Sequence, residues 1–276
     1  MSFQPVVPFG GFAGWQFLQR TMDAQRQAFD AAPVRQRDLD YFRDRIGQIT
    51  SAEALVADRR LRSVALRAFG LGDDIDNRFF IQKVLEGGTD DPAALANRLT
   101  DSRYRAMAEA FGFGNGSLPR TALRGFADQI ADAFLQREFE VGVGQADQSM
   151  RLALTLEREL TGIAARPVTN DTKWLTIMGN PPLRRVFETA LGLPQSFGAL
   201  DLDRQLAEFK DRALSRFGTA DVSGLASPER QQDVVRNFLA QAQISGGFGV
   251  GESGSTSPAL TLLTAAAGGG AAPGLL

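Results

Sequence analysis

The sequence of 276 residues contains neither cysteine nor histidine. Without cysteine there is no disulfide framework, thiolate nucleophile or cysteine metal site. Without histidine the chain lacks the usual general base near neutral pH and the commonest metal ligand. These absences exclude serine–histidine–aspartate and cysteine–histidine catalysis, and with them zinc and haem sites. We therefore predict a protein that is not an enzyme and that has no catalytic, cofactor-binding or metal-binding residues.

An excess of one charge sign is also absent, since 30 basic residues face 32 acidic ones. Lysine and arginine do not gather into a block, so we expect no nucleic-acid partner. No stretch approaches the roughly 18 apolar residues of a membrane span, so no integral membrane segment is expected. The first residues carry no basic side chain before Arg20 and no uninterrupted apolar core, unlike a secretory signal. The default location is the cytoplasm, with export by a route that needs no cleaved signal as the alternative.

Lysine is scarce, because only three of the 30 basic residues are lysine and the rest are arginine. Arginine forks onto phosphate and carboxylate groups, so this surplus could indicate recognition of such groups. A codon preference for arginine is the plainer interpretation, and we favour it. The arginines are spread among aspartate and glutamate at helical spacings, as expected of ion pairs on helix surfaces.

Hydrophobic residues make up 43% of the chain and include 20 phenylalanines, which is ample for a packed core. Their spacing is helical throughout, glycine, aspartate and proline separate the segments, and no alternating strand pattern occurs. The sequence therefore predicts an all-α fold. The predicted helices cover about 14 to the break at Pro33, then 35–47, 51–57, 60–69, 74–86, 91–98, 101–111, 121–140, 146–165, 170–178, 181–190, 201–216 and 228–243.

Several helix starts are marked by capping residues. Thr50 and Glu53 fit a capping box, in which hydroxyl and carboxylate satisfy free amides at the helix start. Other acidic and polar residues precede helical segments in the same way. The predicted N-caps are Asp101, Asn180, Asp201 and Ser227.

The sequence contains an apparent internal repeat. Residues 61–71 align without gaps on 183–193 with six of eleven positions identical, and 103–113 is a looser echo. Each segment places a glycine where a helix should end in a left-handed cap, at Gly70, Gly192 and Gly112. Such endings could recur by chance, but the identities favour a true duplication, with two helical units stacked on one another. The predicted organisation is 1–35 (arm and first helix), 36–145 (first repeat unit), 146–244 (second repeat unit) and 245–276 (tail).

Both ends of the chain differ from the middle. The first dozen residues are rich in proline, glycine and phenylalanine and predict a flexible arm, whereas 245–276 is a Gly/Ser/Ala-rich segment with one charge, typical of a disordered tail. Aromatic side chains often anchor protein interfaces, and those of the arm are our candidate protein interface. The candidate residues are Phe3, Phe9, Phe12 and Trp15. The alternative is that the arm covers a groove of its own domain.

Two apparent motifs lack residues that their chemistry requires. Residues 249–254 match G-x-G-x-x-G, but no lysine follows the last glycine and no strand precedes it. The acidic stretch 73–77 lacks both the ligand and the glycine that a calcium loop needs, because Arg78 and Phe79 stand at those positions. Helix capping explains these acidic residues better.

Several stretches of the sequence resemble a bacterial domain-of-unknown-function family whose genes tend to lie among flagellar genes. The resemblance implies a process rather than a mechanism, because the family has no assigned catalytic residues to transfer. The stretches that carry it lie at 41–42, 49–58, 68–71, 79–85, 94–99, 101–104, 150–154 and 174–184.

Together these features predict a non-enzymatic, flagellum-associated accessory or assembly protein that acts through protein–protein contacts. Flagellar or flagellar-assembly proteins would be its partners, and its oligomeric state stays open. In one variant it remains in the cytoplasm as a chaperone-like or regulatory binder, and in the other it is exported through the flagellar route. The alternative is an enzyme with an Arg/Asp/Glu site between the two helical copies. That alternative predicts a cleft with convergent charges, no ion partners and strongly shifted pKa values.

Overall fold

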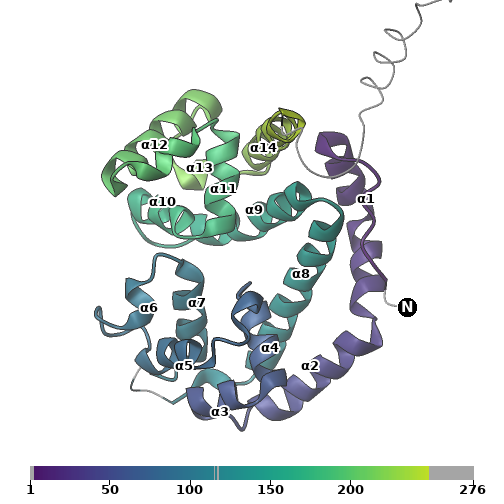
Figure 1. Cartoon of the computed structure of the whole chain (residues 1–276), viewed down its shortest axis with the longest axis vertical. Helices are drawn as coiled ribbons and strands as arrows, with labels where there is room; N and C mark the ends of the chain where they lie inside the picture. Colours follow the sequence, from purple (N-terminus) through teal and green to yellow (C-terminus); the bar gives the residue numbers. More distant parts are fainter. Residues whose placement is uncertain (1–2, 115, 117, 249–276) are drawn as a thin grey trace, which may run out of the picture. The chain divides into compact units, whose positions relative to one another are not determined.

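The structure is a computed structural model that describes residues 3–114, 116 and 118–248. This part of the chain is all-α, as predicted, and contains no β-strand. Three short 3₁₀ helices, η1 (Gly72–Asp74), η2 (Arg120–Ala122) and η3 (Gln195–Ala199), lie between α-helices. The α-helices are α1 (Gly11–Asp30), α2 (Pro33–Ile46), α3 (Ala52–Ala57), α4 (Arg59–Ala68), α5 (Arg78–Gly87), α6 (Leu95–Arg98), α7 (Ser102–Phe111), α8 (Phe126–Ala146), α9 (Gln148–Ala164), α10 (Asn170–Met178), α11 (Pro181–Ala190), α12 (Leu202–Phe217), α13 (Val222–Leu225) and α14 (Pro228–Phe248) (Figure 1).

Capping explains where most helices begin, with one correction to the sequence prediction. Asp101, Asn180 and Asp201 each accept a hydrogen bond from an amide in the first turn of the helix that follows. The cap of α3 is Ser51 rather than Thr50, because the Ser51 hydroxyl accepts from the Ala54 amide at 3.1 Å. The predicted cap at Thr50 is therefore wrong by one residue, and with Ala54 three residues after Ser51 the shifted position cannot form a capping box.

Two apolar clusters form the core of the compact unit Met1–Gln243. The first cluster contains the buried residues from Leu39 to Phe134. The second cluster joins Trp15, Leu18 and Phe29 of α1 to the buried residues from Phe139 to Leu239. Helix α8 contributes to both clusters, packing on α4 with its first part and leading into α9 (Figure 1).

The border between the clusters thus lies within α8, between Phe134 and Phe139. It falls shortly before the border predicted between the two repeat units at 145–146. The predicted units themselves stay a prediction.

The repeated segments end in the same hydrogen-bonded cap. After α4, the Leu71 amide donates to the Leu66 carbonyl and Gly70 has a φ of 71°. After α11, the Leu193 amide donates to the Glu188 carbonyl, which is the same six-to-one pattern. The third, less similar segment ends α7 with a single hydrogen bond, from the Gly112 amide to the Ala108 carbonyl. This shared cap is local, so duplication of the whole units also stays a prediction.

The amino-terminal arm packs against α1. The Val6 amide donates to Gln25 Oε1 at 2.7 Å, and Gln25 Nε2 donates back to the Val6 carbonyl at 3.1 Å. A Cβ on Gly14 would lie 1.8 Å from the Phe9 carbonyl oxygen, so the glycine permits the close approach of the arm. The predicted tail lies almost entirely outside the described residues. Within them, no helix is long and apolar enough to span a membrane.

Candidate functional site

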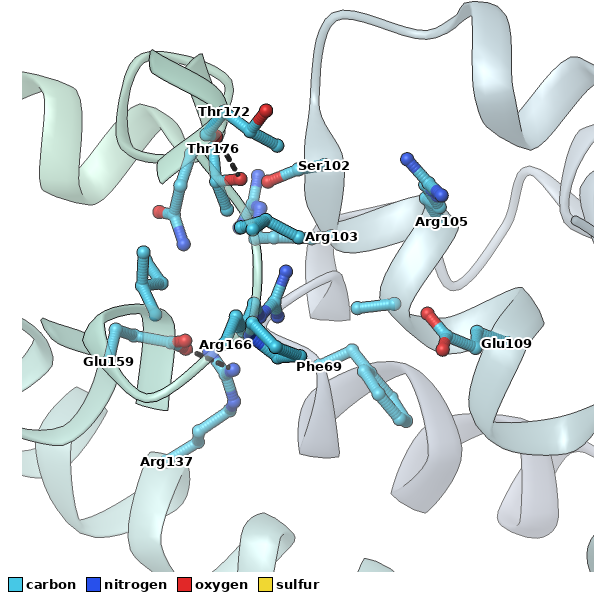
Figure 2. Close-up of a pocket in the computed structure, with 15 residues that line it drawn as sticks. Phe69, Ser102, Arg103, Arg105, Glu109, Arg137, Glu159, Arg166, Thr172 and Thr176 are labelled. Atoms are coloured by element: carbon cyan, nitrogen blue, oxygen red, sulfur yellow. Dashed lines mark hydrogen bonds and ion pairs between the residues drawn. The ribbon is translucent and has the colours of Figure 1, made fainter. Parts of the chain in front are cut away.

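A cleft of about 460 Å³ separates α7 from the end of α9 and from α10. We call it the arginine cleft, because four arginines line it. The Ser102 amide donates to the Gly179 carbonyl at 2.6 Å, which ties the start of α7 to the end of α10. The lining residues are Phe69, Ser102, Arg103, Arg105, Ala106, Glu109, Arg137, Glu159, Ile163, Arg166, Pro167, Val168, Thr172, Thr176 and Asn180 (Figure 2).

Two of the four arginines are already neutralised. Arg137, from α8, donates to Glu159 of α9 at 2.8 Å. Arg103 makes a two-point contact with Asp101, with Nη2 at 2.6 Å and Nε at 3.0 Å from carboxylate oxygens. Arg103 also donates to the Gly70 carbonyl. These charges hold α4, α7, α8 and α9 together and are not available to a ligand.

The Arg137–Glu159 pair continues into a buried ion-pair network. Arg158 donates to Glu140 at 2.6 Å and also contacts Glu159. Glu140 is 3% exposed and also accepts from the Thr155 hydroxyl at 3.2 Å. Removing one partner from such a network would leave an uncompensated buried charge, which is strongly destabilising. The network therefore has a structural role behind the cleft.

Burial and neighbouring charges shift the pKa values of Arg137 and Glu159. Burial, and then the nearby Arg158, lower the pKa of Arg137 to about 10, against the opposing effect of Glu159. Burial alone would raise the pKa of Glu159, but Arg158 and Arg137 outweigh it and the pKa is lowered. Arg137 consequently stays protonated and Glu159 ionised near neutral pH. Neither group is a proton acceptor or donor suited to acid–base catalysis there.

The remaining two arginines have no partner among the residues that the structure describes. Arg105 of α7 and Arg166, just after α9, are exposed and line the cleft. Among the described residues neither guanidinium has an ion pair or a hydrogen bond, and the same holds for the Glu109 carboxylate. Figure 2 shows Arg105 and Glu109 on the α7 side of the cleft, with Thr172, Thr176 and Glu159 on the other side. The cleft thus contains two guanidinium groups and one carboxylate that have no partner within the described residues.

The four predicted interface residues lie elsewhere, at the second cluster. Trp15 is fully buried, and Phe3 and Phe12 are partly buried against the cluster. Phe9 is 50% exposed and packs edge-on against Phe17 at 5.9 Å. Three of the four side chains thus pack against their own domain, and Phe9 is the most accessible. Their role as an interface stays a prediction.

Other residues singled out in the sequence have structural roles. Trp174 is fully buried and donates to the Ala220 carbonyl at 2.8 Å. Asp74 accepts from the Tyr104 hydroxyl at 2.6 Å and from Asn77 at 2.7 Å. No group of three or more acidic residues in the described part of the chain could hold a metal ion.

Sequence reasoning missed the cleft. Arg105 belongs to α7, whereas Arg166 follows the end of α9 in a segment without other charges, so the two lie far apart in the sequence and share no pattern. The surplus of arginine over lysine was a signal for anion recognition, but it did not single out two positions among so many. Only the tertiary fold, which places α7 across the cleft from the end of α9 and from α10, brings the two side chains to one cavity.

The fold and the cleft define an all-α protein with a charged cleft between helices that belong to two apolar clusters. The chain belongs to the family described as "Protein of unknown function (DUF1217)", whose model matches residues 68–235. This match confirms the resemblance to a domain-of-unknown-function family. The association of that family with flagella stays a prediction.

A solved structure has the same fold. It is the X-ray crystal structure of protein AGR_C_984 from Agrobacterium tumefaciens, a structural genomics target. The match has a TM-score of 0.71 and 23% identity, and covers 88% of this chain and 99% of that chain. At this identity the likeness shows the fold alone. No curated protein matches the chain.

Proposed function

We propose that the protein is a non-enzymatic, flagellum-associated accessory or assembly protein that acts through protein–protein contacts. The observation that carries the binding role is the pair of exposed, unpaired arginines in the arginine cleft. Arginine is enriched in protein interfaces, and an exposed guanidinium beside apolar side chains can pair with a carboxylate of a partner. The flagellar part of the proposal comes from the sequence resemblance.

The chemistry of the cleft supports binding over catalysis. The chain has no cysteine or histidine, so nucleophilic catalysis would need another activated side chain. The hydroxyls of Thr172 and Thr176 are engaged locally, since Thr176 donates to the Thr172 carbonyl at 2.8 Å and Thr172 contacts the Thr169 hydroxyl at 2.9 Å. The charged groups deepest in the cleft are in ion pairs that hold helices together.

Deletion of the gene tests the flagellar role. We expect fewer or defective flagella and reduced swimming, restored by the wild-type gene. Fractionation of export-competent and export-blocked cells then separates the two variants. Recovery in flagella or medium that depends on export indicates an exported component, whereas retention in the cytoplasm with a flagellar subunit indicates a chaperone-like binder. Unchanged motility and flagellar number in the deletion strain would contradict the proposal.

An enzyme with an Arg/Asp/Glu site is the second candidate. The observation that favours it is the cleft itself, where Arg137 has a pKa lowered to about 10 and Glu109 has no partner in the described part of the chain. Against it, Arg137 is paired with Glu159 at 2.8 Å rather than free. Turnover of a substrate by the purified chain, abolished by Glu109→Gln with the fold intact, would favour this candidate over binding alone.

A further inference from the structure

We propose that the arginine cleft binds a segment of a partner protein in which carboxylate side chains alternate with apolar ones. The inference rests on the proposed function, because it assumes that the protein acts through protein contacts. It adds the chemistry of the partner: an acidic and apolar peptide segment, held by Arg105 and Arg166 on opposite walls.

The free charges of the cleft select an anionic group. Arg103 and Arg137 are neutralised by Asp101 and Glu159, so they contribute no net charge to a ligand. Arg105 and Arg166 remain and outnumber the free carboxylate of Glu109. Guanidinium is planar and always protonated, and it binds carboxylates through paired hydrogen bonds.

Neutral donors are present as well. Asn180 is 6% exposed and lines the cleft, and its Oδ1 accepts from the Leu183 amide at 3.4 Å. The Asn180 amide nitrogen has no acceptor among the described residues, and neither has the Ser102 hydroxyl. Both groups are suited to hydrogen bonds with a carboxylate or with the carbonyls of an extended peptide backbone.

Carboxylate fits the cleft better than phosphate. Phosphate sites at helix starts depend on free backbone amides. The helix starts at this cleft are already capped: Asp101 accepts from the Arg103 amide at 3.0 Å, and Thr169 accepts from the Thr172 amide at 3.3 Å. The donors that remain lie on side chains. The single Glu109 carboxylate also disfavours a compact dianion more than it disfavours carboxylates spread along a peptide.

The apolar lining calls for apolar side chains between those carboxylates. Ile163 lines the cleft and is buried, whereas Val168 is 43% exposed and lies two residues after Arg166. Phe69 and Ala106, both partly exposed, add apolar surface to the cleft. The cavity of about 460 Å³ is within the range of about 300–1,000 Å³ that ligand sites occupy. Covering this surface stabilises a bound apolar side chain in addition to the charge pairs.

Fluorescence anisotropy with the full chain tests the inference. The probe is a fluorescein-labelled peptide in which Glu alternates with Leu, and the control peptide has Lys in place of each Glu. We expect saturable binding of the acidic peptide and no binding of the control peptide. The double variant Arg105→Glu with Arg166→Glu should weaken it roughly tenfold or more, because each reversal replaces attraction by repulsion.

A matched variant controls for net charge. Arg59 and Arg124 are exposed, do not line the arginine cleft and have no ion pair within the described residues. Arg59→Glu with Arg124→Glu changes the net charge equally and should leave the affinity unchanged. Should the reversed cleft variant fail to fold, Arg105→Gln with Arg166→Gln removes the two charges without adding new ones.

Three results would overturn the inference: no saturable binding of the acidic peptide, equal weakening in both double variants, or binding that the cleft variants leave unchanged. Inorganic phosphate is titrated in parallel. If phosphate binds through Arg105 and Arg166 while the peptide does not, the cleft is a small-anion site and the inference is wrong.

The outcome is separable from that of the proposed function. Peptide binding with unchanged flagella in the deletion strain would retain the cleft and reject the flagellar role. A flagellar defect in the deletion strain that the Arg105→Glu and Arg166→Glu gene fully restores would retain the role and reject the cleft as its binding site.

Discussion

At the scale of the residue, Gly70 lets two arginines approach behind the cleft. Its φ of 71° is in the left-handed region, and a Cβ there would lie 2.9 Å from Arg137 Nη1 and 3.5 Å from Arg103 Nη1. Gly192, at the matching position of the second segment, has a φ of 67° but only Arg216 Nη1 at 3.5 Å. Both positions therefore require a left-handed backbone, but only at Gly70 would a Cβ come too close to a neighbouring side chain.

We predict that Gly70→Ala lowers the free energy of unfolding more than Gly192→Ala does. The left-handed backbone costs each variant about 1–2 kcal/mol. Only Gly70→Ala also displaces the Arg137 guanidinium, which Glu159 holds at 2.8 Å. Urea denaturation of the two variants measures the difference. Equal losses would show that Arg137 moves aside freely.

Glu157 gives a prediction about pH. Burial raises the pKa of its carboxyl above the ordinary value of 4.5, against smaller opposing effects of the hydrogen bond from Gln19 and of Arg26. Between the ordinary and the raised pKa, the folded protein keeps a proton that the unfolded chain has released. The free energy of unfolding therefore falls as pH rises through that window, and the ionised carboxylate destabilises the fold above it.

Glu157→Gln should consequently stabilise the protein at pH 7. The amide oxygen of the new side chain can still accept the hydrogen bond that Gln19 makes to Glu157 at 2.8 Å. The gain in the free energy of unfolding should vanish as pH falls well below the ordinary carboxyl pKa. There, Glu157 of the wild type is protonated in both the folded and the unfolded state. Urea denaturation across this pH range checks it. A gain that persists in acid would indicate better packing instead of a pKa effect.

The residues of the cleft could not be predicted from the sequence for a physical reason. Buried apolar residues such as Trp174 reveal themselves by periodicity, because one face of their helix is apolar. Arg105 and Arg166 lie on exposed faces, where arginine is ordinary. Their significance comes from lacking an ion partner and from sharing a cavity, and both properties depend on tertiary packing.

At the scale of the element, single aspartates join consecutive helices. Asp58 lies between α3 and α4, and Asp147 between α8 and α9. Each has an extended backbone and accepts two amide hydrogen bonds from the first turn of the following helix. One residue with an extended backbone therefore ends a helix and begins the next, so no linker separates the two helices.

Asp58→Ala should destabilise the protein by about 1–2 kcal/mol, the usual effect of removing an N-cap. It also removes the acceptor of the Tyr41 hydroxyl, which lies 2.6 Å from Asp58 Oδ2. Asp58→Asn retains a capping oxygen and should cost less. Thermal and urea unfolding of both variants check the order. Equal costs would mean that the carboxylate charge, and not the cap, is what matters.

Some helix boundaries could be predicted from the sequence and others could not. Helices α10 and α11 match their predicted ranges, because a polar cap and a glycine mark their ends. The start of α8 was predicted at 121 and lies at Phe126, because η2 forms first and Gly125 then has a φ of 85°. A short 3₁₀ turn uses the same residue types as a helix start, so the local pattern cannot separate the two.

At the scale of the whole molecule, α8 couples the two apolar clusters. Ile130 and Phe134 belong to the first cluster, and Phe139 and Val143 belong to the second. Between these pairs, Glu138 binds Arg67 of α4 at 2.8 Å, and Arg137 binds Glu159 of α9. Neither cluster can lose its part of α8 without exposing apolar surface and breaking ion pairs next to the other.

We therefore predict that the two clusters unfold in one cooperative transition. Both tryptophans, Trp15 and Trp174, lie in the second cluster, so their fluorescence reports on that cluster alone. Far-UV circular dichroism reports on the helices of both. The two signals should follow the same urea curve, the usual test of a two-state transition. A fluorescence transition that separates from the loss of helix would contradict the prediction.

A proline in the middle of α8 provides the control. Gln136→Pro removes the amide that donates to the Asp132 carbonyl and places the ring against it, at a cost of about 3 kcal/mol or more. Since residue 136 lies between the parts of α8 that belong to each cluster, both clusters should keep their own side chains. We expect the fluorescence and circular dichroism curves to separate in this variant. Curves that stay together would show that contacts other than α8 couple the clusters.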